Sequence, residues 1–441
     1  MITELGHLDA TAIAEGVRLG NLDPVDVAEH FLGEIQRHEP QLQTLVSFDP
    51  DLVRARAREI ATASSKGLLA GVPFGVKDVF DTIDYPTEFF SPLYAGNRPS
   101  RDAHVVARMR QASGTVIGKT HTCEFAFMHT GPTRNPHDRR RTPGSSSAGS
   151  AAGVAAGLFP IALGTQTAGS LIKPASYCGI YGYKPSFGLV SLEGVKPLAP
   201  SFDTVGWYGR SARDLELVAR LLVPDLPQSY PDPRRVRVGF CRTPYWKSAD
   251  ADVAASIEAA VACIAATDLD VEAVELPSEF DTVCADHQIL NDLEGARSLR
   301  VEFALESGKI SSEAVAMIAR AKSTTWELEQ VVRRRLALLR PQLEALFESY
   351  DVLIGASCGV VAPLGLTATG SSDFIRFWTT FGLPQANIPL LPQPGGLPVG
   401  LQVIGACRND ALVLRLVEWI AARLQRSMGV TRWSSALSAA S

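Results

Sequence analysis

The chain has 441 residues, 46% of them hydrophobic, so it can bury a large core in one domain or in up to about three. Its net charge is only −5, and it contains no run of five or more like charges, which argues against nucleic acid or an anionic membrane as a partner. The longest apolar tract, residues 151–164, is interrupted by glycine and proline and falls short of the about 20 residues that cross a bilayer.

Residues 1–66 form a predicted helical lead-in. Helical apolar periodicity covers residues 9–19, 24–37 and 51–63, and Asp23 fits an N-cap before a proline at the first helical position. We expect these helices to pack outside a sheet.

The segment GVPFGVKD predicts a buried strand that ends near Lys77. Successive side chains of a strand point to opposite faces, so Lys77 and Asp78 should lie in different environments. If Asp78 is turned away, Lys77 can be desolvated without a carboxylate partner, and this lowers the pKa of a lysine. A helix at residues 103–111 and a strand at residues 115–118 should follow.

Two serine clusters set in glycine and alanine dominate residues 144–174. Residues 145–147 form the first cluster and Ser170 the second, with a short helix expected at 151–156 and a buried strand at 159–163. The second turn has the pattern of a strand-to-helix junction, where free backbone N–H groups can point at a developing negative charge. For either cluster alone, a flexible Gly/Ser loop is an equally good interpretation.

The second half of the chain alternates between the two kinds of element, which indicates an α/β architecture. The expected elements are a helix at 211–222, a strand at 236–241, a helix at 251–265 and a strand at 271–276. Residues 280–350 are helical and charge-rich, and Pro341 should kink or restart the last helix of this segment. The segment is either a lid over a substrate pocket or plain packing against the sheet.

The last part of the chain predicts a strand at 351–357, an aromatic helix at 371–381, a strand at 401–404 and a closing helix capped by Asn409 or Asp410. We find no internal repeat and no linker long enough to separate domains.

The sequence indicates neither a metal site nor a cofactor. Residues 121–124 read HTCE without the second histidine of a zinc motif, and residues 114–120 have one residue too few between the glycines of a phosphate loop. The seven cysteines are scattered and odd in number, which is typical of reduced thiols in the cytoplasm.

Three motifs together resemble the amidase signature family, whose members are serine hydrolases of C–N bonds. They are GVPFGVKD, GSSSAGS and GTQTAGSLIKPASYCGIYGYKPS, with further similarity at residues 102–127, 133–138 and 396–405. The resemblance implies a single α/β domain over residues 1–441, with a mixed sheet covered by helices on both faces. Within it, residues 67–230 would form the catalytic core, and residues 280–350 would be the possible lid.

The resemblance also implies a catalytic triad. Ser170 would be the nucleophile, Ser146 a bridging serine on an unusual cis peptide, and Lys77 the base. We therefore expect Lys77 to be buried, hydrogen-bonded to Ser146 and far from any carboxylate, since holding it neutral at pH 7 without a shifted pKa would require about 4.6 kcal/mol.

Further site residues follow from the same motifs. The expected oxyanion donors are the backbone N–H groups of Thr167, Ala168, Gly169 and Ser170. The candidate substrate-binding residues are Ser145, Gln166, Cys123 and Met128.

Four positions depart from the family's common pattern. Family members often carry Asp at the position of Gln166, Arg at that of Lys173, and Gly at those of Ala168 and Ser145. These departures bear on substrate preference and on local geometry more than on the chemistry.

The sequence therefore favours a hydrolase that cleaves the C–N bond of a small or medium neutral amide. Alternatives within the family are a carbamate, urea-type or ester hydrolase. Alternatives from other classes are the glutaminase subunit of a tRNA amidotransferase and a non-catalytic binding module. The expected partner is a small-molecule substrate, and a homodimer is one option for the oligomeric state.

Overall fold

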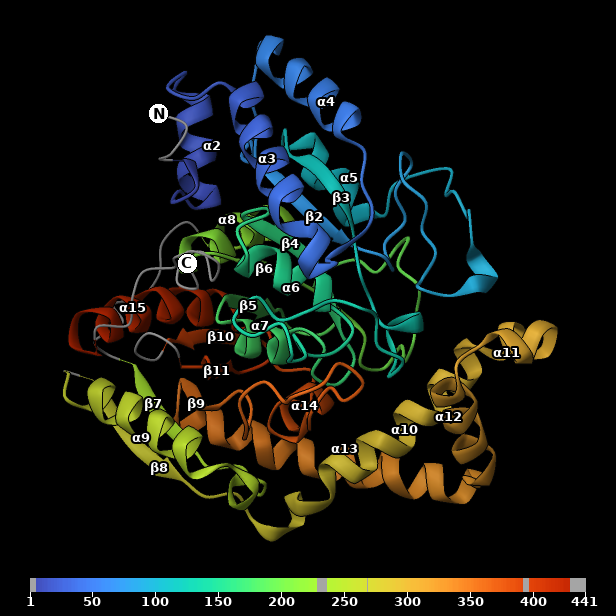
Figure 1. Cartoon of the computed structure of the whole chain (residues 1–441). Coiled ribbons are helices and arrows are strands. Elements are labelled where there is room, and N and C mark those ends of the chain that lie inside the picture. Colours follow the sequence, from blue (N-terminus) through green and yellow to red (C-terminus); the bar gives the residue numbers. More distant parts are fainter. Residues whose placement is uncertain (1–4, 228–235, 268, 392–395, 429–441) are drawn as a thin grey trace.

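A mixed β-sheet forms the centre of the molecule (Figure 1). The computed structural model describes residues 5–227, 236–267, 269–391 and 396–428. These residues build one sheet of eleven strands in the order β1-β3-β2-β4-β6-β5-β10-β11-β9-β7-β8. Its pairs β2–β3, β2–β4, β7–β8 and β7–β9 are parallel, and the other pairs are antiparallel. The expected α/β class with a mixed sheet is confirmed.

The strands are β1 (Leu45–Ser47), β2 (Pro73–Lys77), β3 (Thr115–Thr120), β4 (Ile161–Gln166), β5 (Tyr181–Lys184), β6 (Thr204–Gly209), β7 (Arg237–Cys241), β8 (Asp270–Val274), β9 (Val352–Ala356), β10 (Gln385–Leu390) and β11 (Val399–Gly405). The central strands β2, β4, β6 and β10 are buried along their whole length, as expected for strands covered on both faces.

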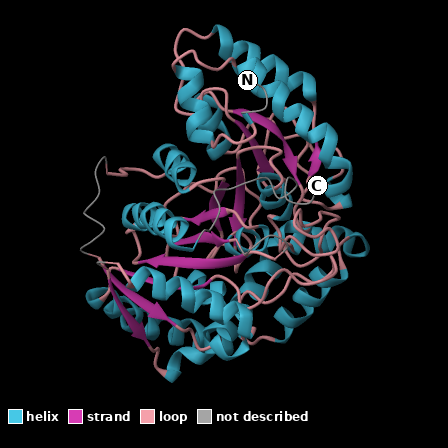
Figure 2. Cartoon of the chain, turned by 60° about the vertical axis from the view of Figure 1, so that its left-hand side comes forward, coloured by secondary structure: helices cyan, strands magenta, loops and turns pink. Residues whose placement is uncertain are grey.

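Helices cover both faces of the sheet, as Figure 2 shows. Helices α6 (Ala148–Ala155) and α7 (Ile172–Cys178) contact each other and pack on one face. Helices α8 (Ala212–Leu222), α9 (Ala251–Ala265) and α15 (Asp410–Met428) pack on the other. None of the helices in the described ranges is long and apolar enough to cross a membrane.

The N-terminal lead-in is helical, as predicted, and α4 packs on β3 at one edge of the sheet (Figure 1). It consists of α2 (Ala10–Arg18), α3 (Pro24–Leu42) and α4 (Pro50–Thr62). The Asp23 side chain accepts a hydrogen bond from the Val25 amide, which confirms the predicted cap. Helix α5 (His104–Gln111) then leads into β3.

The charge-rich segment forms α10 (Val283–Ser298), α11 (Arg300–Glu306), α12 (Ser312–Ser323) and α13 (Trp326–Ser349). Helix α13 continues through Pro341, so of the two expected outcomes, a kink or a restart of the helix, the restart is wrong. Leu339 and Leu343, on either side of the proline, are buried in one apolar cluster with Phe280. This packing offsets the about 3 kcal/mol that an internal proline costs a helix. The aromatic segment forms α14 (Asp373–Thr380).

Close packing of α6 against the chain beside β3 gives a test of the fold. A methyl group added at Gly149 would overlap the backbone oxygen of Thr44 and lie 2.5 Å from the backbone nitrogen of His121. We expect Gly149→Ala to lower the free energy of unfolding by on the order of 2 kcal/mol, because backbone atoms must move.

Gly33→Ala is the matched control, since Gly33 is also helical and a methyl group there meets nothing within 4 Å. It should leave stability unchanged or raise it by up to about 1 kcal/mol. Urea unfolding of both variants makes the comparison, and equal losses would contradict this account of the α6 packing.

Candidate active site

Lys77 ends β2, which lies between β3 and β4 in the sheet, and its side chain is fully buried. Its Nζ donates hydrogen bonds to Ser146 Oγ at 2.7 Å and to Thr165 Oγ1 at 2.6 Å. Ser146 precedes α6, and Thr165 lies on the neighbouring strand β4. The expected burial of Lys77 and its hydrogen bond to Ser146 are both confirmed, and Thr165 is a second hydroxyl partner that the sequence did not reveal.

The strand alternation separates Lys77 from its neighbouring carboxylate. Asp78 forms an ion pair with Lys119 at 3.0 Å, whereas Lys77 forms no ion pair within the described residues. Desolvation lowers the pKa of Lys77 to about 7, with smaller opposing effects from Cys123 and Asp203. Lys77 is therefore able to exist as a neutral amine near neutral pH.

Ser170 lies in the turn between β4 and α7 and lines a cavity. Ser146 is buried and accepts the hydrogen bond from Lys77, but no hydrogen bond joins its side chain to Ser170 in the described structure. The cis peptide that the resemblance implied at Ser146 is not found. All peptide bonds of the described residues are trans, the form favoured by about 3 kcal/mol for non-proline residues.

The turn after β4 is held by hydrogen bonds to its carbonyl groups. The partners come from α10, α14 and α7: His287 Nε2 donates to the Thr167 carbonyl at 3.0 Å, Thr379 Oγ1 to the Ala168 carbonyl at 2.8 Å, and the Lys173 amide to the Gly169 carbonyl at 3.0 Å. In a trans peptide the N–H points opposite to the C=O, so the amides that follow these carbonyls face away from the anchors. Across the described residues, no amide from 167 to 170 donates a hydrogen bond to protein. These N–H groups are thus available as oxyanion donors.

Two buried polar side chains accept hydrogen bonds from this turn and from the start of α7. Gln166 Oε1 accepts from the Leu171 and Ile172 amides, both at 3.0 Å, and Asp203 Oδ1 accepts from Thr167 Oγ1 at 2.6 Å. Burial raises the pKa of the Asp203 carboxyl. Gln166 therefore positions the turn and does not reach the cavity, contrary to its expected role in substrate binding.

No sequence motif predicts the roles of His287 and Asp203 beside this turn. His287 is fully buried against Phe202, and desolvation lowers its pKa to about 3, so it is a neutral donor to Thr167. A lone histidine on a polar helix and an aspartate in a loop carry no sequence signal of this role.

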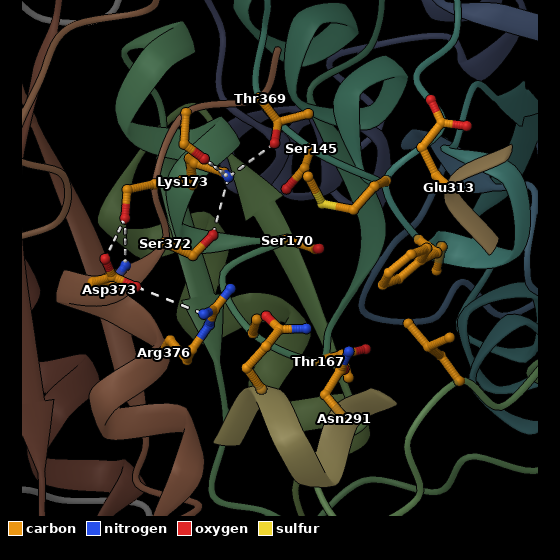
Figure 3. A pocket seen from close by; sticks show the side chains of 18 of the residues that line it. Ser145, Thr167, Ser170, Lys173, Asn291, Glu313, Thr369, Ser372, Asp373 and Arg376 are labelled. Carbon is orange, nitrogen blue, oxygen red and sulfur yellow. Dashed lines mark hydrogen bonds and ion pairs between the residues drawn. The ribbon is translucent and has the colours of Figure 1, made fainter. Parts of the chain in front are cut away.

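The cavity beside Ser170 has a volume of about 560 Å³ (Figure 3). Ser145 and Met128 line it, as predicted for substrate-binding residues. Cys123 does not, because it is buried near Lys77, where desolvation raises the pKa of its thiol to about 11. In the described ranges, no group of three or more His, Cys, Asp and Glu side chains could hold a metal ion.

The helical segment at 280–350 supplies one wall of this cavity. Its lining residues are Gln288 and Asn291 from α10 and Glu313, Ala316 and Arg320 from α12. The segment therefore does more than pack against the sheet, and its opening as a lid stays a prediction.

The match to known proteins covers nearly the whole chain. Residues 26–414 match the model of the Amidase family. The chain belongs to the amidase signature family. Family membership makes it a hydrolase of the class that acts on C–N bonds.

Relatives of this chain include amidotransferase subunits as well as amidases. It is 31% identical to a glutamyl-tRNA(Gln) amidotransferase subunit of Halorhodospira halophila, over 92% of this chain and 94% of the relative. A crystal structure of an amidase superposes with a TM-score of 0.85 at 27% identity, covering 94% of this chain and all of that one. The corresponding amidotransferase subunit of Thermotoga maritima superposes with a TM-score of 0.76 at 25% identity, covering 96% of this chain and 95% of that one.

The buried amine predicts a pH-dependent effect of Lys77→Met. The folded pKa of about 7 lies below the ordinary 10.5, so the unfolded chain binds more protons between these values, and the amine destabilises the fold most below pH 7. The quantity to compare is the unfolding free energy of the variant minus that of the wild type. We expect this difference to be on the order of 2 kcal/mol larger at pH 6 than at pH 9.

Denaturant unfolding of both proteins at the two pH values measures this difference. The loss of the two hydroxyl contacts shifts the variant by a constant amount, so only the pH-dependent part counts. A difference between variant and wild type that does not change with pH would show that Lys77 titrates normally.

Proposed function

We propose that this amidase cleaves the C–N bond of small or medium amides through an acyl-enzyme on Ser170. The observation that carries the proposal is the buried Lys77 amine, whose pKa is lowered to about 7 and which is hydrogen-bonded to Ser146. A neutral amine so placed can take a proton from Ser146 as that hydroxyl takes one from Ser170.

The reaction follows from these positions. Ser170 Oγ attacks the amide carbon as its proton passes through Ser146 to Lys77, and the carbonyl oxygen becomes an oxyanion facing the free amides of the turn. The relay then runs backwards and protonates the departing nitrogen as the C–N bond breaks. Water attacks the acyl-enzyme along the same path and releases the acid and Ser170.

The cavity supports a substrate of modest size. Its volume of about 560 Å³ lies within the range of small-molecule sites. Carbamates, urea-type compounds and esters need the same nucleophile and oxyanion donors, so they are alternatives of the same mechanism.

A second candidate is the glutaminase subunit of a tRNA amidotransferase, which the 31% identity to such a subunit supports. That role requires partner subunits. Amide hydrolysis by the purified single chain, at rates that partner subunits do not change, would exclude it.

Acyl trapping tests the nucleophile. We expect mass spectrometry to find one acyl adduct, on Ser170, after incubation with a panel of amides, anilides and carbamates. Ser170→Ala should abolish the adduct and lower kcat by roughly 10⁴-fold or more. A Ser170→Ala variant that keeps full biological activity would favour the non-catalytic binding module instead.

The pH dependence tests the base. Because Lys77 must be neutral in the free enzyme, kcat/KM should rise about tenfold per pH unit below pH 7 and level off above it. Substrates without a titrating group between pH 5 and pH 9 avoid a competing ionisation. A profile that is flat through pH 7 would exclude Lys77 as the base.

A further inference from the structure

One wall of the cavity carries two cations close to Ser170. They are Lys173 on α7 and Arg376 on α14, and Figure 3 shows both on the same side of Ser170. The Lys173 ammonium is buried and held by oxygens: Nζ donates to Gly370 O at 2.9 Å, Ser372 Oγ at 3.0 Å and Thr369 Oγ1 at 3.4 Å. Lys173 has its three donors satisfied and is not available to a ligand.

Arg376 is different, because its guanidinium has hardly any partner. Its Nη1 lies 3.7 Å from Asp373 Oδ1, an ion pair beyond hydrogen-bond length, and its side chain donates no hydrogen bond to the described residues. Its Nε is buried and unbonded, while the side chain as a whole is 21% exposed, so the outer nitrogens face the cavity. A guanidinium has five N–H donors and stays charged at all working pH values.

On the wall that holds Lys173 and Arg376, positive charges outnumber negative ones. Arg320, a third lining cation, is neutralised by two hydrogen bonds to Asp292, at 2.7 and 3.1 Å. Glu313 lies on the α12 wall beside His129, at 3.4 Å. Asp373 is thus the one lining carboxylate, among the described residues, on the wall that holds Lys173 and Arg376.

We infer that Arg376 binds a carboxylate of the substrate, so the amide cleaved at Ser170 bears an anionic group. A carboxylate matches the planar geometry of a guanidinium and can accept two parallel hydrogen bonds from its unused N–H groups. The inference rests on the proposed hydrolysis at Ser170, and it replaces the neutral amide expected from the sequence with a carboxylate-bearing one.

Two matched substrate pairs test this: succinamate against butanamide, and glutaramate against pentanamide. In each pair a carboxylate is replaced by a methyl group. We expect wild-type kcat/KM to favour the carboxylate member by at least about 20-fold, and Arg376→Gln to reduce that ratio to within about threefold. Arg376→Lys should keep part of the preference, since it retains the charge and loses the planar geometry.

Arg320→Gln is the matched control, because it removes the same charge from the same cavity where a protein carboxylate already neutralises it. It should leave the preference within about threefold of wild type. A wild type without preference, an Arg376→Gln variant that loses both members of a pair equally, or an Arg320→Gln variant that loses as much preference would overturn the inference.

Calorimetric binding of succinamate to Ser170→Ala separates this inference from the proposed function. If the wild type hydrolyses no amide, but Ser170→Ala binds succinamate and loses this binding when Arg376→Gln is added, the proposed hydrolysis is overturned and the carboxylate site is supported. Hydrolysis of both members of each pair without an Arg376-dependent preference would overturn the carboxylate site alone. Absence of both binding and hydrolysis would overturn both.

Discussion

A lysine amine buried without a carboxylate partner is the constraint on which the site depends. The molecule contains an internal comparison. Lys77 and Lys119 lie on adjacent parallel strands, and both are fully buried, but only Lys119 has a carboxylate, that of Asp78. Lys119 also donates to the Phe80 carbonyl and to Thr87. Because successive side chains along a strand point to opposite faces, Asp78 pairs with Lys119, and Lys77 is left with two hydroxyl groups. A hydroxyl group can accept a hydrogen bond from a charged amine and donate one to a neutral amine.

The turn that carries Ser170 is held by hydrogen bonds from several elements. Its carbonyls and side chains are bound by groups from α10, α14, β4 and the loop before β6, which are far apart in the sequence. A turn held from several directions needs little rearrangement when charge develops on a substrate oxygen, and such preorganisation is a large part of catalysis by oxyanion donors. The helical segment after residue 280 takes part in holding this turn, since His287 belongs to it.

Local pattern predicted much of this fold, and its failures have physical causes. The capped, amphipathic helix α8 lies within one residue of its predicted bounds, and α3 begins where predicted but ends at Leu42 and not at residue 37. Strands β5, β6 and β10 were missed because they are short, rich in glycine, aromatic and polar residues, or interrupted by Pro389, and they are strands only through their neighbours in the sheet. The Lys77–Ser146 contact followed from the motifs. The role of Gln166 did not, because a side chain next to a nucleophile can point into the cavity or back into the turn, and sequence alone does not distinguish these directions.

The proposed reacting groups and the cavity walls lie on different parts of this molecule. Lys77 ends β2, and Ser146 and Ser170 lie in the turns before α6 and α7, all within residues 77–178. The facing walls come from α10, α12 and the stretch leading into α14, which lie more than 100 residues further along the chain. Asp373 and Arg376 are three residues apart on one helix, so their loose pairing is set by α14 alone and is independent of the nucleophile turn. Similarity in the serine motifs therefore identifies the family, whereas the later helices that line the cavity carry no such motif and are where we expect the choice of substrate to be made.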